Sequence, residues 1–219
     1  MDFYFYLVFT LSYLILLIVG FVKRREKNIM SFTVFLYLVI VGLTVDNAII
    51  AFGKWIGTGS LLESLHLFRY WIHALITPTL LLFCLGLLQK SGKKYFSTAR
   101  AVWITLMCTC VLILIEIITV VAVIELKPVM EYGILHYVPV KEHVGSILMI
   151  IMVSLILLVT GFLLYIFTSW KWMLVGTIIM GIGSALPIKV DSTAFTNALE
   201  LVLMISLVAT DITFSNKKQ

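Results

Sequence analysis

The sequence predicts an all-α membrane protein, a bundle of seven transmembrane helices that forms a single domain over residues 1–219. Of these 219 residues, 62% are hydrophobic and 12% are charged, whereas soluble domains carry charge on about 25% of their residues. The hydrophobic residues gather into seven long runs separated by polar loops. Because the bilayer interior supplies no water to the backbone, runs of this kind are expected to form helices.

Each run is long enough to cross about 30 Å of hydrocarbon, which takes ~17 to 25 residues of helix. The predicted spans are Phe3–Val22, Met30–Phe52, Leu67–Gln89, Ala101–Ile124, Val144–Thr168, Trp172–Ile188 and Phe195–Phe214. Basic residues follow the first run instead of preceding it, so this run is expected to remain as a span and not to be removed as a signal peptide. Pro78 is expected to kink the third span.

Basic residues predict the orientation of the bundle. Residues 23–27 and the loop 90–100 each contain four Lys or Arg side chains. Both loops are expected to be cytoplasmic, since Lys and Arg are enriched on that side of a membrane. An odd number of spans then places the N-terminus outside and the C-terminus in the cytoplasm of a multi-pass protein of the cell membrane. The net charge of +5 follows from these loops, and it does not indicate a nucleic-acid partner.

Two loops predicted to lie outside carry further signals. Ser60 precedes Glu63 by three residues, a capping box that predicts a helix starting at Leu61, above the membrane. Residues 57–60 are interpreted as a flexible glycine-rich loop, with a phosphate site as the alternative. The loop 125–143 is long enough to fold back as a lid over the outer face.

Polar side chains are predicted to share one depth within the bundle. From a rise of ~1.5 Å per residue, the central members lie roughly 8 to 12 Å below the outer boundary. These are Asp46, Asn47, His73, Glu116 and Glu200, with Arg69 and His143 just above them, Asn197 beside them, Ser184 near them, and Thr77 on the same helical stripe as His73. Because ionisable groups in hydrocarbon are costly, they are expected to line a polar cavity that opens outward. Alternatively, they pair with one another and only hold the bundle together.

The first functional hypothesis is an enzyme that acts on a lipid or another lipophilic substrate from the outer face. Its predicted catalytic residues are His73, Asp46, Glu116 and Glu200, because an imidazole beside a carboxylate suits acid–base chemistry near neutral pH. The predicted substrate-binding residues are Arg69, Asn47, Thr77, His143, Ser184 and Asn197. Membrane lipids and a lipophilic or phosphate-bearing small molecule are the expected partners.

Two other functions stay open at this point. A proton-coupled carrier of small solutes would use Glu116, Glu200 and Asp46 for the coupling ion, and a ligand sensor would signal through the basic loops. The sequence identifies no cofactor and no metal site. A metal held by His73, His143 and a carboxylate is an alternative, and haem bound to the same two histidines is a weaker one, because only His73 lies clearly inside a span.

Overall fold

The computed structural model describes residues 2–24, 31–141, 144–186 and 190–216. In chain order the main elements are α1 (Asp2–Lys23), α2 (Phe35–Ile56), α3 (Ser60–Ile76), α4 (Leu80–Lys90), α5 (Ala99–Glu116), β1 (Leu126–Glu131), β2 (Ile134–Pro139), α6 (Val144–Thr168), α7 (Trp172–Ala185) and α8 (Phe195–Asn216). Short 3-10 turns lie at Phe32–Val34, Thr77–Thr79 and Lys94–Ser97, and a π-helical turn, Ile117–Val121, extends α5.

The all-α membrane bundle predicted from the sequence is confirmed. Among the described residues, six helical stretches are long and apolar enough to cross a bilayer: Asp2–Lys23, Phe32–Ile56, Ser60–Lys90, Ala99–Val121, Val144–Thr168 and Phe195–Asn216. The predicted span Trp172–Ile188 corresponds to α7, which has 14 residues and ends at Ala185. Leu186 follows it outside the helix, and residues 187–188 lie outside the described part. The chain is therefore a multi-pass integral membrane protein.

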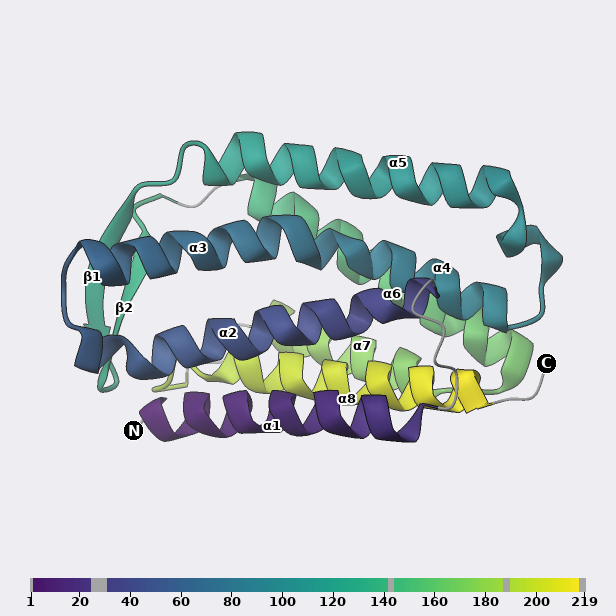
Figure 1. Cartoon of the computed structure of the whole chain (residues 1–219), viewed down its shortest axis with the longest axis horizontal. Helices are drawn as coiled ribbons and strands as arrows, with labels where there is room; N and C mark the ends of the chain where they lie inside the picture. The colour runs from purple at the N-terminus through teal and green to yellow at the C-terminus, as the bar shows by residue number, and fades with distance from the viewer. Residues whose placement is uncertain (1, 25–30, 142–143, 187–189, 217–219) are drawn as a thin grey trace.

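The connections alternate between two ends of the bundle (Figure 1). The start of α1, the α2–α3 connection and the β1–β2 hairpin lie at one end, which we call the hairpin end. The end of α1, the loop 90–100 and the end of α8 lie at the other, which we call the basic end. This alternation agrees with the predicted topology. That the hairpin end faces outside stays a prediction.

The third span is broken near its middle, as Pro78 predicts. Helix α3 ends at Ile76, a 3-10 turn follows, and α4 resumes at Leu80. Proline lacks an amide hydrogen and its ring clashes with the preceding turn. The Thr79 hydroxyl donates to the Ile76 carbonyl over 2.6 Å, which satisfies a backbone acceptor at the break. The span therefore consists of two helices, α3 and α4, joined by the 3-10 turn.

The loop 125–143 contains an antiparallel hairpin that the sequence interpretation missed. Tyr132 and Gly133, at its tip, have φ angles of 47° and 87°, the two positive values that tight hairpin turns require. Ile134 and Leu135 are buried, and strand β2 packs against α2 and α3. The backbone of Leu135 lies so close to Gly53 that a side chain at residue 53 would overlap it. The hairpin thus covers the end of α2 and the start of α3, as the predicted lid would.

The capping box predicted at Ser60 is wrong. Helix α3 begins at Ser60 itself, Gly59 occupies the N-cap position, and no side chain caps this end. With Ser60 already inside the first turn, its hydroxyl is one position too late to serve as the cap. The Gly59 amide instead donates to the Tyr137 hydroxyl over 3.2 Å, so this loop supports the hairpin.

Candidate functional site

The centre of the candidate site is the carboxylate of Asp46, which lies in the middle of α2. Its side chain is 5% exposed, and its Oδ1 accepts from Arg69 Nε over 2.7 Å. The same oxygen lies 3.2 Å from His73 Nε2. Arg69 and His73 are four residues apart on α3, so they share one face of that helix. A buried carboxylate therefore holds both a guanidinium and an imidazole from the neighbouring helix.

The same face of α3 extends this cluster in both directions. The Thr77 hydroxyl lies 3.4 Å from His73 Nδ1, so the imidazole is placed between a carboxylate and a hydroxyl. Arg69 Nη1 lies 2.6 Å from His66 Nδ1. Because a guanidinium has no acceptor, His66 must accept at Nδ1 and carry its proton on Nε2. His66 is fully buried, and its Nε2 has no hydrogen-bond partner among the described residues.

Side chains from α8 and α1 face the same region. Asn197 Nδ2 donates to Asn47 Oδ1 over 3.1 Å, which joins α8 to α2. Glu200, one turn further along α8, interacts electrostatically with His73 and Asp46. Tyr13 of α1 is fully buried, and its hydroxyl has no hydrogen-bond partner in the described part of the chain. Sequence reasoning missed Tyr13, whose one signal is a polar atom in the middle of an apolar span.

His73 is more accessible than the carboxylate to which it is bonded. The side chain of His73 is 32% exposed although its partner Asp46 is 5% exposed. His73 lies on the inward face of α3, because the lipid-facing side of that helix is formed by the exposed residues Phe68, Trp71 and Leu75. Glu200 is also partly exposed, and it interacts electrostatically with His73.

The hairpin places a third histidine close to this cluster. His136 of β2 lies with its ring centroid 6.5 Å from that of His66, and its Nδ1 has no partner among the described residues. Burial lowers the pKa of His136, and the positive charge of Arg69 lowers it further. The imidazole of His136 is therefore neutral at physiological pH.

Three predicted site residues are not placed with this cluster. Glu116 is buried at the end of α5 and accepts a hydrogen bond from Ser146 of α6 over 3.2 Å. Ser184 of α7 is exposed and lines an apolar groove of about 700 Å³ between α6 and α7. His143 lies outside the described residues. The structure thus brings together seven of the ten predicted residues: Asp46, Asn47, Arg69, His73, Thr77, Asn197 and Glu200.

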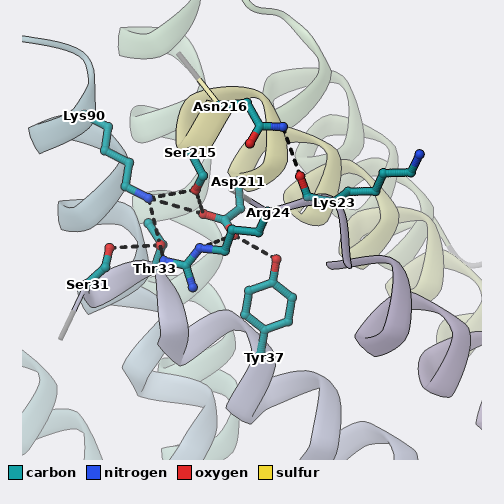
Figure 2. A network of polar contacts seen from close by, with 9 residues as sticks. All are labelled: Lys23, Arg24, Ser31, Thr33, Tyr37, Lys90, Asp211, Ser215 and Asn216. Atoms are coloured by element: carbon teal, nitrogen blue, oxygen red, sulfur yellow. Dashed lines mark hydrogen bonds and ion pairs between the residues drawn. The ribbon is translucent and has the colours of Figure 1, made fainter. Parts of the chain in front are cut away.

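A second charged cluster lies at the basic end, and Figure 2 shows its arrangement. Asp211 of α8 is fully buried and accepts from the Tyr37 hydroxyl over 2.8 Å. Its carboxylate lies 3.7 Å from Arg24 Nε and 3.6 Å from Lys90 Nζ. Lys90 also donates to Thr33 over 3.0 Å. This cluster therefore ties the ends of α1, α2, α4 and α8 together.

The described residues contain no group of three or more His, Cys, Asp or Glu side chains arranged to hold a metal ion. No known protein family, curated protein or solved structure matches the chain. The function is therefore argued from the site alone.

Proposed function

We propose that the protein is an enzyme of the cell membrane that acts on a lipid or another lipophilic molecule. The observation that carries this proposal is the placement of His73 between the Asp46 carboxylate and the Thr77 hydroxyl, with its side chain 32% exposed. An imidazole that is oriented by a carboxylate is suited to accept or donate a proton near neutral pH. The Nδ1–Oγ1 separation of 3.4 Å is long, as is common before a substrate binds.

The remaining residues take supporting roles in this proposal. Arg69 pairs with Asp46 over 2.7 Å and holds it in place, so the carboxylate orients the imidazole. Glu200, which interacts electrostatically with His73, supplies a second acid or base. Asn47 and Asn197 hold α8 at this distance from α2. The substrate enters from the hairpin end, where the polar residues are closest to the membrane surface.

The proposal is tested by purifying the full chain into nanodiscs made from a total bacterial lipid extract. Mass spectrometry then follows which lipid species are consumed over time. His73→Gln should reduce the rate by about 10²- to 10⁴-fold, the usual contribution of a general acid or base. Ser184→Ala is the matched control, since Ser184 is exposed and lies outside the cluster. A lipid profile that changes equally with wild type and folded His73→Gln would sink the proposal.

A proton-coupled carrier is the second candidate, and the position of Asp211 favours it. Glu200 and Asp211 are eleven residues apart on α8, which is about three turns, so they lie on nearly the same face. Between them Met204 and Leu207 are buried, which closes the path in this conformation. Solute uptake into proteoliposomes that depends on a pH gradient, without lipid turnover, would favour the carrier over the enzyme.

A further inference from the structure

An apolar groove lies between α4, α5 and α6, in the half of the bundle next to the basic end. Its volume is about 290 Å³. Buried leucines of α4, including Leu81, Leu85 and Leu88, line it. Cys108 of α5 is exposed and lines the groove as well. Helix α5 lies at the edge of the bundle (Figure 1), so the groove is accessible from the surrounding lipid.

The end of this groove meets the most basic loop of the protein. Tyr95 and Phe96 line the groove, and they belong to the 3-10 turn Lys94–Ser97. Lys93, Lys94 and Arg100 flank these residues and are exposed. Between Glu63 and Glu116 the sequence contains no Asp or Glu. The apolar groove therefore ends at a basic loop. The sequence between Glu63 and Glu116 supplies no acidic residue that could offset the positive charge of this loop.

Two features of this arrangement match the two parts of an anionic phospholipid. The leucine-lined groove suits an acyl chain, because methylene groups make many van der Waals contacts with the apolar side chains that line it. The basic loop suits a phosphate head group, because clusters of Lys and Arg beside a span attract anionic lipids. Exposed Tyr95, at 73%, sits between the two parts, where aromatic side chains prefer the membrane interface.

We propose that this groove is a specific binding site for one anionic phospholipid, with its acyl chain between α4, α5 and α6 and its phosphate at Lys93, Lys94 and Arg100. The site is separate from the Asp46 cluster, which lies in the other half of the bundle. It is also independent of whether the protein is an enzyme or a carrier.

Native mass spectrometry of the full chain tests the site. The protein is released from vesicles that contain equal amounts of phosphatidylglycerol and phosphatidylcholine, and the lipid that stays bound is identified. We expect one phosphatidylglycerol to be retained in preference. Neutralising Lys94 and Arg100 together with Gln should weaken retention roughly 25-fold, about fivefold for each charge. Lys54→Gln with Lys127→Gln, two exposed lysines away from the groove, should leave retention unchanged.

A second pair of variants tests the groove without changing any charge. Cys108→Phe fills the groove and should abolish retention of phosphatidylglycerol. Cys110→Phe is its matched control, because Cys110 is also exposed on α5 but does not line the groove. Equal retention of the two lipids by wild type, or unchanged retention in Cys108→Phe, overturns the proposal. A second copy of the chain retained in place of lipid overturns it too.

Discussion

Replacing Asp46 with Asn is expected to destabilise the bundle by about 3–5 kcal/mol, the usual cost of removing one partner from a buried ion pair. The Asp46 side chain is 5% exposed and that of Arg69 is 15% exposed, with 2.7 Å between Oδ1 and Nε. At an effective dielectric constant of about 20, two charges about 4 Å apart interact by about 4 kcal/mol. Asparagine keeps the shape of the side chain but leaves the Arg69 guanidinium without this carboxylate.

A double-mutant cycle separates the ion pair from other effects. Asp46→Asn and Arg69→Gln each leave one buried charge behind, whereas the double variant leaves neither. The double variant should therefore be destabilised by less than the sum of the two single variants. Unfolding is measured by circular dichroism as detergent micelles are enriched in dodecyl sulfate. Asp191→Asn, at an exposed position, should change the free energy of unfolding by less than about 0.5 kcal/mol. Additive single effects, or a loss below about 1 kcal/mol in Asp46→Asn, would refute the assignment of a strong buried pair.

Three further predictions concern the second cluster and the hairpin. Asp211→Asn should lower stability by about 3–5 kcal/mol, because a fully buried carboxylate between cations is lost; an unchanged unfolding midpoint in the same assay would contradict this. Gly53→Ala should cost about 1–3 kcal/mol, because the new methyl group overlaps the Leu135 backbone, and faster proteolysis of the hairpin would report the displacement. The lowered pKa of His136, caused by burial and by Arg69, makes the unfolded chain bind a proton more tightly than the folded one. The contribution of His136 to the free energy of unfolding is then fully present above about pH 6.5 and is lost as the pH drops below it. Thermal unfolding between pH 5 and 7.5 should show a smaller slope in His136→Asn than in wild type, and identical slopes would exclude this origin.

The membrane spans were predictable because lipid imposes a simple rule on long apolar runs. Helix α6 has the predicted bounds, Val144–Thr168, and α1 differs from its predicted span by one residue at each end. The hairpin was missed for the opposite reason, since it lies where water satisfies the backbone and hydropathy carries no signal. The signal in the sequence was local, because Gly133 readily adopts a positive φ. In the structure Tyr132 and Gly133 both have positive φ, and such a turn joins two short strands.

The direction in which the candidate site residues face around the bundle was not predictable from the sequence. Counting residues along a helix gives the height of a side chain, whereas the face it turns depends on which helices pack together. Glu116 is buried, but α5 directs it towards Ser146 of α6. Gly183 packs against Leu199 of α8, so the next residue, Ser184, is rotated by about 100° and faces the groove with α6. Neither neighbour is encoded in the local sequence.

The two charged clusters fix α2 and α8 at two different levels of the bundle. The Asp46 cluster, at the middle of α2, joins α2 to α3 and interacts with Glu200 of α8. At the basic end, Asp211 of α8 contacts Tyr37 of α2 and Lys90 of α4. Arg24 and Lys90 count as cytoplasmic signals by the positive-inside rule, yet both side chains are at most 9% exposed. The same residues therefore mark topology and hold the helix ends. Pro78 separates α3 from α4, so each half of that span is fixed by its own cluster. A displacement of the side chains in one cluster therefore does not have to bend a continuous helix that reaches the other cluster.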